Sequence, residues 1–152
     1  MLDLTVVIPL LNEEDNLVLL YEKLTAVLTE WARPYELIFV DDGSTDRSLS
    51  ILQEFYTADP QRVRIVQLRR NFGKTSAMVA GFQLAQGDVL ITIDADLQDD
   101  PAEIPAMLAK LDEGYDLVVG WRKERMDHAK KKLSSRFYNT AVPVWHAPIY
   151  TT

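Results

Sequence analysis

Apolar residues along this chain follow two different spacings. Residues 4–9 form a short, almost entirely apolar run rich in valine and isoleucine, and a polar turn at Asn12 follows it. Beyond the turn the apolar residues recur every three or four positions, at Leu17, Leu20, Leu24, Val27 and Leu28. A run that is apolar on both faces predicts a buried β-strand, and the wider spacing predicts an amphipathic helix. The N-terminal segment therefore predicts a strand, a turn and a helix.

The same unit recurs as far as residue 120. Further buried strands are predicted at residues 36–41, 63–68, 88–93 and 116–120. Among the intervening helices, one is predicted at residues 74–85 with Met78 and Phe82 on one face, and another begins where Asp100 precedes Pro101. Buried strands that alternate with helices predict an α/β fold, a Rossmann-like, mostly parallel sheet with helices on both faces.

Polar clusters follow each predicted strand. Ligands of parallel sheets bind beyond the carboxyl ends of the strands, so these clusters are the candidate site. They are Asn12 and Glu13, Asp41 and Asp42, residues 71–74, residues 94–98 and residues 121–125.

The strongest chemical signal is the pair Asp94 and Asp96. Residues two apart at the end of a strand project to the same side, and two such charges about 4 Å apart repel by about 4 kcal/mol at an effective dielectric near 20. A divalent cation would offset that repulsion, and an oxygen-only set completed by the Gln98 amide suits Mg²⁺ or Mn²⁺. The alternative is an acidic helix-capping turn, a role that we assign to Asp100.

Asp41 and Asp42 end the second predicted strand and precede Gly43, which permits a tight turn. Carboxylates at such a turn can accept hydrogen bonds from a base or from ribose hydroxyls. A plain helix cap accounts for Ser44 but not for two successive aspartates.

Lys74 lies in a Gly-Lys-Thr sequence that ends like a phosphate-binding loop. The full motif needs a glycine where this chain has Leu68, so the P-loop interpretation fails. A lysine at a helix N-terminus can still bind phosphate, and a solvated lysine is the open alternative.

Composition excludes several classes of protein. The chain has 152 residues, the length of one domain, and no cysteine, which rules out disulfides and thiol chemistry. Its net charge of −7 suits a duplex nucleic acid poorly. Residues 122–136 nevertheless carry seven basic and two acidic side chains, which predicts a contact with phosphate or an anionic membrane, or else a solvated helix face. No signal peptide or membrane span is visible.

Taken together, the motifs resemble inverting, metal-dependent glycosyltransferases of family two, and among them the polyprenyl-phosphate hexose synthases. The resemblance covers residue 4 to about residue 140. The motifs that carry it are Ile8-Pro9 with Asn12-Glu13, residues 40–46, residues 70–74, residues 94–99, and Gly120-Trp121-Arg122 with Arg125.

The resemblance implies a GT-A fold, a nucleotide-diphosphate sugar donor and a cell-envelope role. It assigns catalysis to Asp94, Asp96 and Arg122, and Mg²⁺ or Mn²⁺ to Asp94, Asp96 and Gln98. Donor-binding residues would be Pro9, Asn12, Glu13, Asp41, Asp42, Ser44, Lys74 and Asp94. Phosphate and acceptor contacts would come from Arg122, Arg125, Lys132 and Arg136.

The implied reaction transfers a hexose, with inversion, to a polyprenyl phosphate at the cytoplasmic face of a membrane. We expect a donor-binding domain at residues 1–125, a basic amphipathic segment that contacts the membrane at 126–141, and an unassigned tail at 142–152, where His146 is expected to be inert. The family's later elements, including its usual transmembrane helices, do not follow Asn139. We therefore expect a fold truncated on its C-terminal side, and a soluble or peripheral chain that binds donor and metal but transfers sugar poorly.

Two alternatives come from other classes. A haloacid-dehalogenase-like phosphatase would use Asp94 and Asp96 as nucleophile and acid, but in that fold the paired aspartates follow the first strand. A nucleotide-sugar-binding module without transfer activity shares the donor site, and an assay with lipid phosphate would distinguish it.

Overall fold

The computed structural model describes residues 2–120. Its strands are β1 (Leu2–Leu10), β2 (Tyr35–Asp41), β3 (Val63–Gln67) and β4 (Gly87–Thr92). Its helices are α1 (Leu17–Trp31), α2 (Ser48–Ala58), α3 (Lys74–Phe82), the short 3-10 helix η1 (Pro101–Glu103) and α4 (Ile104–Asp112). Strands and helices alternate as the hydrophobic pattern predicts. No helix in this part of the chain is long and apolar enough to cross a bilayer.

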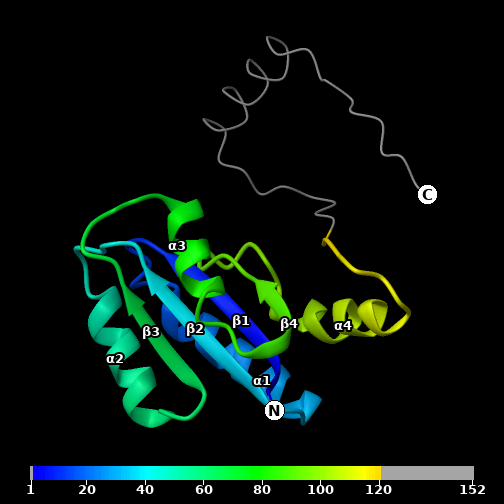
Figure 1. The fold of residues 1–152 in the computed structure, drawn as a ribbon. Coiled ribbons are helices and arrows are strands. Elements are labelled where there is room, and N and C mark those ends of the chain that lie inside the picture. The colour runs from blue at the N-terminus through cyan, green and yellow to red at the C-terminus, as the bar shows by residue number, and fades with distance from the viewer. Residues whose placement is uncertain (1, 121–152) are drawn as a thin grey trace, which may run out of the picture. The chain divides into compact units, whose positions relative to one another are not determined.

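The four strands form one sheet in the order β3-β2-β1-β4, and every neighbouring pair is parallel. The predicted parallel α/β fold is therefore confirmed (Figure 1). β1 and β2 lie inside the sheet, and all seven residues of β2 are buried. Burial alternates along the edge strand β4 instead, because only one of its faces is covered.

The two faces of the sheet are covered unequally. One large core cluster joins the sheet to α1, α2 and α4, through residues such as Leu24, Phe55 and Leu108. A smaller cluster on the other face joins Val7, Ile38 and Val40 to α3. Figure 1 shows α3 in front of the sheet and α1 behind it.

α3 packs through its small residues rather than its large ones. Ala77 and Gly81 are buried, whereas Phe82 is 38% exposed, so the side of the helix that packs on the sheet is not centred on Met78 and Phe82. A Cβ placed on Gly81 would lie 2.4 Å from a methyl group of Val7. The helix comes too close to β1 for a large side chain to fit between them, and Phe82 turns outward.

The predicted fifth strand is also absent from the described residues. Residues 116–120 have no regular structure, and Leu117 and Val119 are each 77% exposed. An apolar run forms a strand only if it finds a ladder partner, and this segment has none within residues 2–120. The predicted cap at Asp100 is confirmed for η1, which leads directly into α4, because the Asp100 side chain accepts a hydrogen bond from the Ala102 N–H at 3.2 Å.

A buried carboxylate holds together the amino-terminal ends of the strands. Glu36 is 1% exposed, and its Oε1 accepts hydrogen bonds from the Thr5 hydroxyl and the Gln86 N–H, each at 2.7 Å. The Arg64 Nε lies 3.1 Å from Glu36 Oε2, in an ionic contact outside hydrogen-bond geometry. Arg64 also donates to the Gln86 side chain at 2.9 Å, so this cluster ties the turn before β4 to the neighbouring strands.

Removing the positive charge from this cluster should cost more than removing both charges. We expect Arg64→Met to lower the free energy of unfolding by about 2 kcal/mol, because the buried Glu36 carboxylate loses its counter-charge. The double variant Arg64→Met, Glu36→Gln should recover part of that loss, because a neutral amide needs no counter-charge. Urea unfolding followed by circular dichroism measures both.

Lys110→Met is the matched control, because Lys110 pairs with Glu113 between two groups that are more than half exposed. It should change the free energy of unfolding by no more than about 0.5 kcal/mol. A double variant less stable than Arg64→Met would contradict the ionic role of Arg64.

Candidate functional site

The carboxyl edge of the sheet opens between β1 and β4. The ladder between these strands ends where Val7 faces Thr92 and accepts a hydrogen bond from the Ile93 N–H, whereas β1 continues beside β2 to Leu10. Pro9, which the sequence predicts to bind the donor, lies two residues after Val7 and has no N–H to extend the ladder. The connection that leaves β1 leads to β2 on one side, whereas the connection that leaves β3 crosses to β4 on the other side of β1. Ligands of open parallel sheets bind at such a point.

Asp41 and Asp42 lie at this edge but differ in their partners. Asp41 is fully buried, and its Oδ1 accepts a hydrogen bond from the Ser44 N–H at 2.8 Å, whereas its Oδ2 has no hydrogen-bond partner within the described part of the chain. Asp42 is 4% exposed and uses both oxygens, accepting from the Phe72 N–H at 2.8 Å and the Gly73 N–H at 2.9 Å. Asp42 therefore anchors the loop after β3, and Asp41 keeps a buried acceptor that is unused.

The loops after β1 and β2 are joined by reciprocal hydrogen bonds. The Asn12 N–H donates to the Ser44 hydroxyl at 2.9 Å, and the Asn12 side-chain oxygen accepts from the Thr45 N–H at 2.8 Å. Asn12 has a φ of 55°, a left-handed conformation that asparagine tolerates well. Two predicted donor-binding residues, Asn12 and Ser44, are thus occupied with each other.

The same junction contains groups that the sequence did not single out. The Glu13 N–H donates to the Ser48 hydroxyl at 2.9 Å, and the Glu14 N–H donates to Asp46 at 3.2 Å. The predicted residue Glu13 also accepts, through Oε2, a hydrogen bond from the Asn16 amide at 2.7 Å. A sequence signal for Glu14 and Asp46 did exist, because polar residues that follow adjacent parallel strands must meet.

The pKa of Asp46, which lies at this edge of the sheet, is shifted by its surroundings. Burial alone would raise its pKa, but hydrogen bonds from the side chain and backbone of Ser48 and from the Glu14 backbone outweigh burial. The pKa of Asp46 therefore lies below its ordinary value. The ionised carboxylate stabilises the loop junction fully when the pH is above the ordinary pKa of aspartate, and this stabilisation is lost as the pH falls through the lowered pKa.

The loop after β3 packs directly on the turn after β2. Gly43 has a φ of 80°, and a Cβ placed on it would lie 2.6 Å from the Arg70 carbonyl carbon. Only glycine satisfies both the conformation and the contact. With the Asp42 bonds, this contact fixes residues 70–73 against β2.

Lys74 and Asp94 meet across this edge although 20 residues separate them. The Lys74 Nζ lies 2.5 Å from Asp94 Oδ1 and 2.7 Å from Asp94 Oδ2. The Lys74 side chain is 59% exposed, so both interpretations that the sequence left open, a phosphate contact and a solvated lysine, stay predictions. The structure places the lysine on a predicted metal ligand.

Asp94 and Asp96 follow a strand that ends one residue earlier than the sequence predicts. β4 stops at Thr92, and residues 95–96 form a turn that continues into Leu97 at a φ of 59°. Asp96 Oδ1 accepts a hydrogen bond from the Gln98 N–H at 3.1 Å, and Asp99 accepts from the Asp94 N–H at 3.4 Å. The two aspartates are therefore presented by a turn and not by strand alternation.

The oxygen donors of this turn suit a hard cation that arrives with a phosphate. Asp94 and Asp96 are both partly exposed, and the ammonium group on Asp94 shows that positive charge is accommodated there. Within residues 2–120, no three acidic, histidine or cysteine side chains gather into a complete metal site. Mg²⁺ commonly binds through one or two carboxylates together with substrate phosphates and water, which matches this donor set.

Four predicted phosphate and acceptor residues lie outside the described residues: Arg122, Arg125, Lys132 and Arg136. The predicted segments 126–141 and 142–152 lie outside them as well. The assignments of these residues and segments stay predictions.

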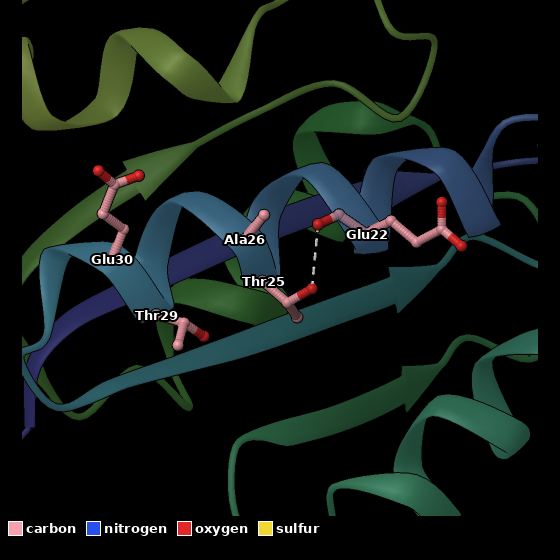
Figure 2. Close-up of a pocket in the computed structure, with 5 residues that line it drawn as sticks. All are labelled: Glu22, Thr25, Ala26, Thr29 and Glu30. Carbon is pink, nitrogen blue, oxygen red and sulfur yellow. Dashed lines mark hydrogen bonds between the residues drawn. The ribbon is translucent and has the colours of Figure 1, made fainter.

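An open depression on the outer surface of α1 does not coincide with this edge. Glu22, Thr25, Ala26, Thr29 and Glu30 line it, all from one helix (Figure 2). The Thr25 hydroxyl donates to the carbonyl groups of Tyr21 and Glu22. The convergent polar groups of three loops make the sheet edge the better candidate site.

Comparison with known proteins agrees with the geometry. Residues 5–151 match the family described as glycosyl transferase family 2. The undecaprenyl-phosphate 4-deoxy-4-formamido-L-arabinose transferase of Pectobacterium carotovorum is 44% identical over 140 residues, which is 92% of this chain and 43% of the relative. The transferase of the same name from Pseudomonas aeruginosa is 44% identical over 138 residues, 91% of this chain and 41% of the relative. The chain thus spans less than half the length of these relatives.

Solved structures show the same fold. The mannosyltransferase PcManGT of Pyrobaculum calidifontis, in complex with GDP-Man and Mn²⁺, has a TM-score of 0.51 and 28% identity, over 61% of this chain and 27% of its own. S. aureus TarS in complex with UDP has a TM-score of 0.58 and 24% identity, over 74% of this chain and 32% of its own, which shows the fold alone. The family match over nearly the whole chain, the 44% identity of the relatives and the shared GT-A-like fold lead to one conclusion: this chain belongs to glycosyl transferase family 2.

Proposed function

We propose that this chain forms the donor-binding part of a polyprenyl-phosphate glycosyltransferase that uses a nucleoside-diphosphate sugar and a divalent cation. The observation that carries the proposal is Asp41 Oδ2 at the carboxyl end of β2, a fully buried carboxylate oxygen that has no hydrogen-bond partner among residues 2–120. An unsatisfied buried acceptor is costly unless a ligand completes it. A nucleoside base or ribose supplies the N–H or O–H donors that this oxygen lacks.

The hydrogen bonds divide the predicted donor-binding residues into two groups. Asp41 is proposed to contact the nucleoside directly. Asn12, Ser44 and Asp42 are proposed to act by holding the three loops in place, because their polar groups bond to neighbouring loop atoms. Pro9 and Glu13 line the same edge and are proposed to shape the nucleoside site.

The diphosphate is proposed to lie between α3 and the turn after β4. Asp94 and Asp96, with the Gln98 amide, would hold Mg²⁺ or Mn²⁺ there. The bound cation would supply charge neutralisation for the departing nucleoside diphosphate. The Mn²⁺ and GDP-Man of the mannosyltransferase structure support a metal-assisted donor site on this fold.

The proposed reaction is an in-line displacement at the anomeric carbon. An oxygen of the lipid phosphate forms the new bond to that carbon while the bond to the nucleoside diphosphate breaks, with inversion. The acceptor is ionised at neutral pH, so this chain's residues need to position and neutralise the reactants more than to remove a proton. Arg122 and the basic residues after it are proposed to contact the acceptor phosphate and the membrane surface.

The relatives refine the proposed substrates. Their names specify undecaprenyl phosphate and a formamido derivative of arabinose, which is a pentose. We therefore propose an undecaprenyl-phosphate acceptor and an amino-pentose derivative, in place of the hexose that the motifs suggested.

The first test concerns Asp41. Asp41→Asn should weaken the binding of uridine or guanosine, whichever the protein prefers, by about 10-fold or more, because an amide N–H₂ replaces the acceptor at Oδ2. Titration calorimetry with the free nucleosides measures the effect without phosphate or metal. The same variant should be at least as stable as the parent to urea, because it removes a buried charge whose Oδ2 lacks a hydrogen-bond partner among the residues that the structure describes.

Asp15→Asn is the control, because Asp15 is exposed after β1 and should leave nucleoside affinity unchanged. Unchanged nucleoside affinity in Asp41→Asn would remove the observation on which the proposed function rests.

The second test concerns Asp96. The parent should bind uridine or guanosine diphosphate more tightly with Mn²⁺ than without it, and Asp96→Ala should abolish that difference because too few anionic ligands remain. Binding of the free nucleoside should stay within about 2-fold in this variant, as expected for a group that acts on phosphate and metal. Calorimetry with and without Mn²⁺ provides both measurements. A full Mn²⁺ effect in Asp96→Ala would exclude Asp96 as a metal ligand.

A further inference from the structure

The contact between Lys74 and Asp94 places a positive charge of the protein on a carboxylate that the proposed donor complex requires. The Lys74 Nζ is within 2.7 Å of both Asp94 oxygens, so the carboxylate is engaged on both of its acceptors. The Lys74 side chain is 59% exposed and that of Asp94 is 32% exposed. Both groups are therefore open to exchange with a ligand from solvent.

The position of Lys74 follows from the backbone before it. The N–H groups of Phe72 and Gly73 donate to the two oxygens of Asp42, which is itself buried at the end of β2. Gly73 has a φ of 92°, and Lys74 is the first residue of α3. The hydrogen bonds to Asp42 thus fix the backbone just before Lys74, and this backbone places the lysine beside Asp94.

An ion pair between two partly exposed side chains, such as Lys74 and Asp94, contributes little net stability, because both partners are well hydrated when apart. The lysine can therefore leave Asp94 at small cost when a better partner arrives. An anionic diphosphate oxygen is such a partner, since an ammonium group binds phosphate readily.

We propose that Lys74 is the resident cation of the empty donor site: it occupies Asp94 before the donor binds, and it moves to an oxygen of the donor's diphosphate when a divalent cation is bound at Asp94. This proposal rests on the proposed function. It deepens that function by making cation and diphosphate binding interdependent. Each lowers the cost of binding the other, because both require the Lys74–Asp94 pair to open.

Mn²⁺ alone provides a test that needs neither donor nor activity. Lys74→Met removes the competing charge and keeps a long apolar stem, so its affinity for Mn²⁺ alone should rise about 3-fold to 10-fold. Electron paramagnetic resonance of free Mn²⁺ measures this directly. Lys74→Arg keeps the charge and should resemble the parent, and Lys110→Met removes a lysine from a surface pair with Glu113 and should change nothing.

Nucleotide binding supplies the second arm. In Lys74→Met, affinity for uridine or guanosine diphosphate in the presence of Mn²⁺ should fall about 5-fold or more, while affinity for the free nucleoside stays at the parent value. The Mn²⁺-dependent gain in diphosphate affinity should shrink in the same variant.

Equal Mn²⁺ affinity in the parent and Lys74→Met, including no measurable binding in either, would overturn the resident-cation proposal. So would a lower Mn²⁺ affinity in the variant, which would make the lysine a support of the site and not a competitor. Failure of the parent to bind any nucleoside or nucleotide would instead overturn the proposed function, so the two failures are distinguishable.

Discussion

A carboxylate buried in an apolar sheet must find hydrogen-bond donors, and much of this structure is organised by how three such groups find them. Glu36 is satisfied by Thr5, the backbone of Gln86 and the charge of Arg64, and this cluster ties the amino-terminal ends of the strands together. Asp42 is satisfied by two backbone N–H groups of the loop after β3. Within residues 2–120, Asp41 accepts a hydrogen bond at one of its two oxygens. The first two carboxylates stabilise the fold, and the third is the group that we propose binds the nucleoside.

The loops at the carboxyl edge use most of their polar groups on one another. Asn12, Ser44, Thr45 and Asp46 join the loops after β1 and β2, and Gly43 brings the loop after β3 into contact with the second of them. Such interlocking makes the edge a preorganised surface, since fewer side chains must be ordered when a ligand binds. The groups that point to ligand chemistry are consequently few: Asp41, the turn from Asp94 to Gln98, and Lys74.

The chain belongs to glycosyl transferase family 2, and the groups at this edge can be compared with the parts of the proposed donor. A nucleotide sugar presents a base, a ribose and a diphosphate, and the edge offers a buried acceptor at one strand end and charged groups at another. In the proposed function, the separation between β2 and β4 divides nucleoside recognition from phosphate chemistry. The relatives are more than twice as long as the matched region, and the proposed function assigns the donor side of the reaction to the described residues.

The sequence by itself determined the order and type of the elements, because strand and helix periodicity are local properties of the hydrophobic pattern. It also located the Asp100 cap and the polar clusters at the strand ends. It misplaced the inward face of α3, because the close approach of Gly81 to Val7 depends on packing between distant segments. It also predicted a strand at residues 116–120, since an apolar run carries no information about whether a ladder partner exists.

The assignment of roles within the site was decided only by the tertiary structure. The sequence grouped Asp41 with Asp42 and Asp94 with Asp96, because neighbours in sequence look alike in chemistry. In the structure, Asp42 instead accepts a hydrogen bond from a loop residue 30 positions away, and Asp94 pairs with a lysine 20 positions away. The register of β1, β2 and β4 brings these groups together. Hydrogen bonds of this range depend on which backbone groups the fold leaves unpaired, and no local pattern records that.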